Sequence, residues 1–286
     1  MALKYVLITG CSEGGIGSAT ALAFQRLGTH HVFATARSLS KMSNLATLPN
    51  VTCLELDVTS PSSVSAAKQK VAERTGGKLD VLLNNAGMLS MAPALDTDVD
   101  MARSVFDVNF WGVVNVTNAF VKMVIAARGV VATTGSIAGD INGPFQSFYA
   151  ASKAAIMIYS ETLRLELAPF GVRVLTMATG VVSSNLGSGL SDAVSLPADS
   201  LYKPVEGALK ARLKGGGYAK MDAHEYAGNF VRLVEAGTSG KVYLGNSAGV
   251  VKWAKMLLPA WITVSVTRFL FSSTPYLDPW SSCSAC

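Results

Sequence analysis

A tyrosine and a lysine stand four residues apart in the segment YAASK, with Tyr149 first and Lys153 last. The alanine and serine between them favour or tolerate a helix, and positions i and i+4 lie one above the other on the same helix face. A cation this close favours the phenolate and lowers the pKa of the phenol from its ordinary value near 10, which is the chemistry of proton transfer. Most tyrosine–lysine pairs at this spacing are solvated surface pairs, so the pair needs support from the rest of the chain.

A glycine-rich loop follows the first apolar run, in the segment TGCSEGGIG at 9–17. Glycines in a strand-to-helix turn let backbone N–H groups approach a pyrophosphate at the positive N-terminus of the helix. A plain turn would not need Gly10, Gly14, Gly15 and Gly17 together. The loop predicts a dinucleotide-binding site.

A basic residue ends the second apolar run, which reads FATARS and contains Arg37 with no acid beside it. An Asp or Glu at this place accepts from the ribose 2′-OH of NAD, whereas an arginine binds the 2′-phosphate of NADP. The segment therefore favours NADPH/NADP⁺ as the cofactor. The alternative is that Arg37 is an ordinary surface residue.

Short β-branched runs alternate with helical stretches along the chain. Strands are predicted at 5–9, 31–36, 51–56, 80–84, 129–134, 172–177 and, at the sheet edge, 241–245. Helices are predicted at 16–28, 61–75, 98–127 and 149–168. Near-continuous apolar strands alternating with helices predict an α/β fold, with a doubly wound parallel sheet of about seven strands covered by helices on both faces.

The chain is expected to form one catalytic domain over 1–250, with an apolar extension over 251–286 packed on it. Residues 185–221, rich in glycine and small polar residues, are expected to form a substrate lid. The apolar stretch 255–271 is too short to span a bilayer, which takes roughly 20 residues. It is interpreted as a buried helix or a lid in preference to an interfacial membrane anchor.

Composition excludes several function classes. The net charge is +5 and the basic residues form no stripe with interleaved aromatics, which argues against a nucleic-acid surface. The three histidines, His30, His31 and His224, offer little to a metal site or a serine–histidine hydrolase, and no metal is expected. The four cysteines form no disulfide framework and the N-terminus does not read as a secretory signal, so an intracellular, cytoplasmic location is expected. Peripheral contact with the endoplasmic reticulum or lipid droplets is a less favoured alternative.

Taken together, these segments resemble the short-chain dehydrogenase/reductase family. The resemblance rests on TGCSEGGIG, LDV at 56–58, NNAG at 84–87, VNFWG at 108–112, GSIAG at 135–139 and YAASK, in the family's order. The extra loop glycine, LPADSLYKPVE at 196–206 and the Trp-containing tail resemble the fungal and yeast group that includes NADPH-dependent 1-acyldihydroxyacetone-phosphate reductase. The resemblance implies a single-domain Rossmann-type fold and a homo-oligomer, dimer or tetramer.

The resemblance also implies catalytic roles. Tyr149 matches the family's general acid, which donates a proton to the substrate oxygen as hydride arrives from the nicotinamide. Lys153 matches the lysine that lowers the phenol pKa and binds the nicotinamide ribose, and Ser136 matches the serine that binds the substrate carbonyl. Asn109 matches the asparagine whose backbone carbonyl holds a water linking lysine to solvent, and it could also interrupt the helix at 98–127.

Cofactor contacts carry over by position. The expected set is Gly10, Ser12, Gly15, Ile16, Gly17, Arg37, Asp57, Val58, Asn85, Ala86, Gly87, Tyr149, Lys153, Gly180, Val182 and Ser184. In TGVVSS at 179–184 the sequence departs from the family, because Thr179 replaces a proline and Ser184 a threonine. This loop is expected to be looser than in the family.

The predicted activity is NADPH-dependent reduction of a ketone to a secondary alcohol on a lipophilic substrate, in the class EC 1.1.1.-. Phe145 and Phe148 suggest an apolar substrate body, with ordinary packing as the alternative. Four basic residues of the lid, Lys203, Lys210, Arg212 and Lys214, could meet a phosphate or form a solvated face. Alternative functions are acyl-glycerone-phosphate reduction proper, NADP-dependent alcohol oxidation in secondary metabolism and, least favoured, a non-catalytic dinucleotide-binding protein.

Overall fold

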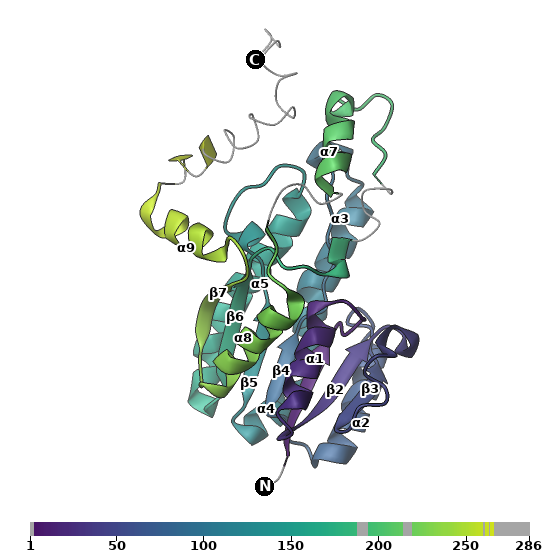
Figure 1. The fold of residues 1–286 in the computed structure, drawn as a ribbon, viewed down its shortest axis with the longest axis vertical. Coiled ribbons are helices and arrows are strands. Elements are labelled where there is room, and N and C mark those ends of the chain that lie inside the picture. Colours follow the sequence, from purple (N-terminus) through teal and green to yellow (C-terminus); the bar gives the residue numbers. More distant parts are fainter. Residues whose placement is uncertain (1–2, 188–193, 214–218, 260, 263, 266–286) are drawn as a thin grey trace.

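Seven parallel strands form one sheet at the centre of the computed structural model, which describes residues 3–187, 194–213, 219–259, 261–262 and 264–265. The strand order is β3-β2-β1-β4-β5-β6-β7 (Figure 1). The strands are β1 (Lys4–Thr9), β2 (His30–Ala36), β3 (Val51–Glu55), β4 (Val81–Asn84), β5 (Val130–Thr134), β6 (Arg173–Thr179) and β7 (Gly240–Leu244). The order reverses between β1 and β4, so the predicted doubly wound sheet, including a seventh strand at its edge, is confirmed.

Helices cover both faces of the sheet. The helices of the described residues are α1 (Ile16–Arg26), α2 (Pro61–Thr75), α3 (Val99–Phe106), α4 (Gly112–Ala127), α5 (Ser147–Leu167), α7 (Glu206–Leu213), α8 (Ala223–Glu235) and α9 (Ala248–Leu257), of which α7 lies away from the sheet (Figure 1). Along β1, Val6 and Ile8 pack with Phe24 of α1 and Phe230 of α8, whereas Leu7 packs on the other side with Phe120 of α4. Successive side chains of a strand point to opposite faces, so nearly every strand position must be apolar to meet two helical layers.

The predicted helices did not include α8, although its start is marked in the sequence. The Asp222 side chain accepts hydrogen bonds from the backbone N–H groups of His224 and Glu225, as an N-cap does. Tyr226 and Phe230 follow at a spacing of four and are buried.

The helix predicted over 98–127 is continuous but changes its winding. Between α3 and α4 lies one π-helical turn, Asp107–Trp111, with Asn109 buried inside it. The whole helix is long and apolar enough to cross a bilayer by composition. Here its inner side, with Val116, Phe120 and Val124 fully buried, packs on the sheet as a core helix.

The C-terminal extension packs on the domain only in part. Val251 of α9 is buried, while Val250, Trp253, Met256 and Leu257 on the opposite side of the helix are exposed. Figure 1 shows α9 at the periphery, beyond the β7 edge of the sheet. In the described part Ala254 and Ile262 are half-buried beside the buried Val251, and residues 266–286 lie outside the described residues, so the packing expected of 251–286 stays a prediction.

The predicted lid is described in three pieces, Asn185–Gly187, 194–213 and 219–221, and Lys214 lies outside them. Within it, Lys203 and Lys210 each lie 2.6 Å from the Glu206 carboxylate. These two lysines form ion pairs on their own helical segment, which favours a solvated face over a phosphate site.

The stability of the sheet–helix core is testable at Phe120, which has no exposed surface. We expect Phe120→Ala to lower the free energy of unfolding by about 3–5 kcal/mol, because it removes buried apolar area and leaves a cavity. Phe170→Ala is the matched control, since that phenylalanine is 53% exposed, and it should cost less than about 1 kcal/mol. Urea unfolding midpoints measure both, and equal losses would contradict this assignment of the core.

Candidate active site

A cleft of about 600 Å³ opens where the carboxyl ends of the strands meet. Sixteen of the eighteen predicted site residues line it; Gly17 and Asn109 do not. The lining predicted residues are Gly10, Ser12, Gly15, Ile16, Arg37, Asp57, Val58, Asn85, Ala86, Gly87, Ser136, Tyr149, Lys153, Gly180, Val182 and Ser184. Side chains separated by more than a hundred positions in the chain thus share one cavity.

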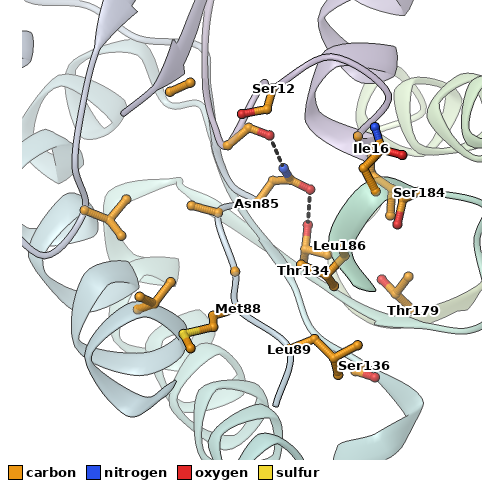
Figure 2. A pocket seen from close by; sticks show the side chains of 18 of the residues that line it. Ser12, Ile16, Asn85, Met88, Leu89, Thr134, Ser136, Thr179, Ser184 and Leu186 are labelled. Atoms are coloured by element: carbon orange, nitrogen blue, oxygen red, sulfur yellow. Dashed lines mark hydrogen bonds between the residues drawn. The ribbon is translucent and has the colours of Figure 1, made fainter. Parts of the chain in front are cut away.

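The glycine-rich loop fits tightly against the loop after β4. Gly10 has φ +74°, and a Cβ there would lie 2.8 Å from Ala86 Cα. The Asn85 side chain fixes the pair by donating to the backbone oxygens of Thr9 and Gly10, at 2.9 and 3.1 Å. Figure 2 shows Asn85 between the glycine-rich loop and Thr134, whose hydroxyl donates to the Asn85 side-chain oxygen at 3.4 Å.

Gly17 packs under the glycine-rich loop and does not line the cleft. A Cβ at Gly17 would strike the Gly10 carbonyl oxygen and lie 2.6 Å from the Asn85 amide nitrogen. The first turn of α1 can therefore approach the loop closely, which brings its N-terminal amides to the cleft with no side chain capping them. Such an N-terminus is a binding site for a phosphate group.

One end of the cleft is lined by Arg37, Asp57 and Val58. Arg37 is exposed to solvent. The Asp57 carboxylate accepts from the backbone N–H and hydroxyl of Thr59, at 2.9 and 2.7 Å, which fixes the turn after β3. The structure also brings Glu13 to the cleft, although the sequence around Arg37 holds no acid. Glu13 arrives because its backbone N–H donates to the Lys41 carbonyl at 2.8 Å, in the segment after β2.

Ser136, Tyr149 and Lys153 gather at the other end. Ser136 follows β5 after one glycine, and Tyr149 and Lys153 lie in the first two turns of α5 with 8% and 5% exposure. The Lys153 ammonium donates to the Thr134 carbonyl at 2.9 Å and lies 5.9 Å from the centre of the Tyr149 ring. The pair is buried, so the reading of YAASK as a solvated surface pair is wrong.

The expected lowering of the phenol pKa is not found in this state. Burial raises the pKa of Tyr149, and hydrogen bonding with Ser136 only partly offsets it. Burial also lowers the pKa of Lys153 to about 8, from an ordinary value of 10.5. Desolvation is the largest cause of the pKa shift in both groups, and the Lys153 ammonium is directed at the Thr134 carbonyl. A phenol that keeps its proton at neutral pH is a competent general acid.

Asn109 acts as a brace behind the cleft. Its side-chain oxygen accepts from Met88 N–H at 2.8 Å, and its amide donates to Met88 O at 2.9 Å and to the Ser152 hydroxyl at 3.0 Å. The π-helical turn and the loop after β4 are thereby tied to α5, one residue before Lys153. Asn109 thus both sits at the irregular turn of the long helix and supports the catalytic helix.

Hydrogen bonds hold the loop after β6. The Thr179 hydroxyl, at the position where the resemblance implies a proline, bonds the Tyr226 hydroxyl of α8 at 2.7 Å. Gly180 N–H donates to Leu244 O at 2.8 Å, and Val182 forms a bridge with Met221. The comparison with a proline-containing loop stays a prediction.

Several lining residues were not predicted. They are Glu13, Ala36, Leu56, Thr59, Met88, Leu89, Val108, Thr134, Gly135, Thr179, Asn185 and Leu186. Most of them flank a predicted residue at the carboxyl end of a strand, which is where ligands bind in open α/β sheets. Asn185 also donates from its side-chain amide to Glu13 O, at 3.1 Å, and from its backbone N–H to Gly14 O, at 3.3 Å.

A family model described as short chain dehydrogenase matches residues 4–194, which is more than half of the chain. The chain belongs to the short-chain dehydrogenase/reductase family. It is 42% identical to the short-chain dehydrogenase ptmH of Penicillium ochrochloron, over 93% of this chain and 97% of that relative. It is 45% identical to an NADPH-dependent 1-acyldihydroxyacetone phosphate reductase of Schizosaccharomyces pombe, over 70% of this chain and 68% of that relative. The predicted family and the class EC 1.1.1.- are confirmed, whereas the acyldihydroxyacetone-phosphate group is one resemblance among several.

Solved structures agree on the fold. A short-chain dehydrogenase from Streptomyces avermitilis superposes with a TM-score of 0.74 at 25% identity, covering 98% of each chain. One from Burkholderia cenocepacia, determined in complex with NADP, superposes with a TM-score of 0.72 at 22% identity over 95% of this chain and 97% of that one.

As a short-chain dehydrogenase/reductase, the protein uses an NAD(P) dinucleotide, and the cleft fits one. Gly10, Ser12 and Gly15 line the cleft beside the uncapped N-terminus of α1, where a pyrophosphate would bind, and Asp57 and Val58 line it where the adenine would lie. A bound nicotinamide would supply a hydride, and Ser136, Tyr149 and Lys153 line the same cleft.

The buried ammonium of Lys153 generates a prediction about activity. We expect Lys153→Met to lower kcat by roughly 10²–10⁴-fold, because the phenolate left after proton donation loses its nearby cation. In the unmodified enzyme kcat for carbonyl reduction should fall as pH rises through about 8, where Lys153 loses its charge. The exposed Lys122→Met is the control and should keep both the rate and the pH profile.

Loss of the Lys153 charge should lower kcat but raise the stability of the protein. Between pH 8 and 10.5 the folded state holds fewer protons on Lys153 than the unfolded state, so the stability of the unmodified protein should rise with pH across this window. The free energy of unfolding of the unmodified protein should rise by roughly 3 kcal/mol across this window, and Lys153→Met should abolish that rise. Urea unfolding of both proteins at several pH values measures the difference, and parallel curves would show that Lys153 is not desolvated.

Proposed function

We propose that the protein is an NADP(H)-dependent oxidoreductase that interconverts a ketone and a secondary alcohol on a lipophilic metabolite. The observation that carries this is the buried group of Ser136, Tyr149 and Lys153 in the cofactor cleft. Ser136 orients the carbonyl, Tyr149 gives its proton to the carbonyl oxygen, and the Lys153 charge stabilises the phenolate. The same steps in reverse oxidise the alcohol, so direction depends on the cofactor ratio.

Apolar side chains support a lipophilic substrate. Met88, Leu89 and Leu186 line the cleft. Phe145 and Phe148, suggested for the substrate body, do not line the cleft. The Phe145 ring lies 6.0 Å from the Tyr202 ring at an interplanar angle of 87°, an edge-to-face contact with the described part of the lid. Phe145 holds φ +66°, which is uncommon for an aromatic residue and is typical of functional loops.

Between the two substrate classes considered, a ketone or alcohol of secondary metabolism has more support than an acyl-glycerone phosphate. The relatives that match over nine tenths of this chain are fungal short-chain dehydrogenases, whereas the acyldihydroxyacetone-phosphate reductase matches over 70%. In the described part of the lid, Lys203 and Lys210 are paired with Glu206, so they give a substrate phosphate no free partner.

The role of Tyr149 is tested by Tyr149→Phe, which removes only the transferable proton. We expect kcat to fall at least about 10²-fold for NADPH-dependent reduction of acetophenone or phenanthrenequinone, with the Kd for NADPH within twofold. Tyr159→Phe, on the same helix and outside the cleft, is the matched control. Substantial turnover by the Tyr149→Phe variant, or no turnover of any ketone or alcohol by the unmodified protein, would refute the proposed function.

Cofactor choice is tested at Arg37. We expect kcat/KM for NADPH to exceed that for NADH by at least about tenfold, which is roughly 1.4 kcal/mol. Arg37→Asp should reverse the preference, because attraction to the 2′-phosphate becomes repulsion. Arg26→Asp, the same charge change on α1 outside the cleft, should leave the preference unchanged. Equal use of both cofactors by the unmodified enzyme would refute the predicted preference.

A further inference from the structure

The carboxylate of Asp140 is buried behind the active site, with 1% of its side chain exposed. Two lysines and a tyrosine surround it. Lys241 donates to both carboxylate oxygens, at 2.6 and 2.8 Å, and the Tyr243 hydroxyl donates to one of them at 3.0 Å. The Lys255 ammonium pairs with the other. Asp140 thus joins β7, which carries Lys241 and Tyr243, to α9, which carries Lys255.

Asp140 ends the short turn that Ser136 begins. The turn, Ile137–Gly139, is 3₁₀-helical; the Ser136 hydroxyl caps its start by accepting from Ala138 N–H at 3.1 Å. Asp140 N–H closes its end by donating to Ile137 O at 2.9 Å. A tether on Asp140 therefore restrains the turn that carries the catalytic serine.

The opposite side of this turn lies against the catalytic helix. A Cβ on Gly139 would lie 2.7 Å from Ala154 N and 2.8 Å from the Lys153 carbonyl carbon. The turn is therefore held between α5, at the residue that carries the catalytic ammonium, and the Asp140 cluster at the sheet edge.

The charges of the cluster suit a strong tether. Burial alone raises the pKa of Asp140, but hydrogen bonds from Lys241, Lys255 and Tyr243 outweigh it and lower the pKa below its ordinary value. The carboxylate is therefore ionised at neutral pH. Breaking a buried, hydrogen-bonded ion pair by removing one partner leaves the other charge uncompensated.

We propose that Asp140 is a positioning residue that fixes Ser136 for carbonyl binding by tying the turn 136–140 to Lys241 and Tyr243 of β7, and that Lys255 docks α9 on the same anchor. This rests on the proposed function of Ser136. It also gives the start of the C-terminal extension a structural connection to the active site.

The test compares Asp140→Asn with Asp80→Asn. Asp80 is likewise a hydrogen-bonded carboxylate: it accepts from Tyr5 N–H at 2.7 Å, outside the cleft and before β4. We expect Asp140→Asn to lower kcat for phenanthrenequinone by about tenfold, the scale of a small misplacement of a catalytic group, and to leave the Kd for NADPH within twofold. Asp80→Asn should change stability without changing kcat.

A double-mutant cycle separates positioning from general destabilisation. If Asp140 acts through Ser136, Asp140→Asn should cause less than a twofold further loss of kcat in a Ser136→Ala background. A tenfold further loss would overturn the proposal, as would an unchanged kcat in Asp140→Asn.

Hydrogen exchange gives a readout that needs no substrate. Asp140→Asn should speed exchange in a peptide covering 136–141 by at least about tenfold, whereas Lys255→Met should speed exchange in 248–257 and leave 136–141 unchanged. Equal exchange of 136–141 in Asp140→Asn and the unmodified protein would refute the anchor. If the unmodified protein turns over no carbonyl compound, the proposed function fails and this comparison still decides the role of Asp140.

Discussion

Burial of a lysine ammonium beside the end of β5 is the constraint on which the active site depends. Lys153 has lost most of its water, and it donates a hydrogen bond to the Thr134 carbonyl, at 2.9 Å. A buried ammonium is costly unless hydrogen-bonded, so α5 must be held against the sheet at this register. Asn109 and Ser152 brace the helix from one side, and the turn containing Gly139 fills the other. The catalytic phenol, one helical turn earlier, takes its position from the same packing.

Much of this arrangement was predictable because it follows from periodicity and from residues whose chemistry is local. The seven strands were found because parallel strands covered on both faces must be almost wholly apolar. Gly10 and Arg37 were found because a tight turn and a strand end are visible within a few residues. The prediction placed Tyr149 and Lys153 on one helix face, which requires only the 3.6-residue repeat.

What was missed depends on contacts between distant segments. Glu13 lies in the cleft because its backbone N–H donates a hydrogen bond to the Lys41 carbonyl. The Thr179 hydroxyl forms a hydrogen bond with the Tyr226 hydroxyl, 47 residues away. The phenol pKa could not be inferred from the Tyr149–Lys153 spacing, because desolvation depends on everything packed around the pair. The ion pairs of Asp140 could not be predicted from the sequence, because its partners lie about a hundred residues later, on β7 and α9. Local sequence patterns therefore predict helices and strands, whereas the pairing of buried charged groups depends on how those helices and strands pack together.

The contact of Asn185 with the glycine-rich loop has a consequence for how variants of this region can be interpreted. Asn185 opens the segment assigned to the lid, and it donates hydrogen bonds to the backbone oxygens of Glu13 and Gly14 in the glycine-rich loop. Two walls of the cleft that differ in sequence by about 170 positions are therefore joined through one side chain. A substitution at Asn185 would disturb both walls at once, so a change in KM for a substrate has to be measured beside the Kd for the dinucleotide.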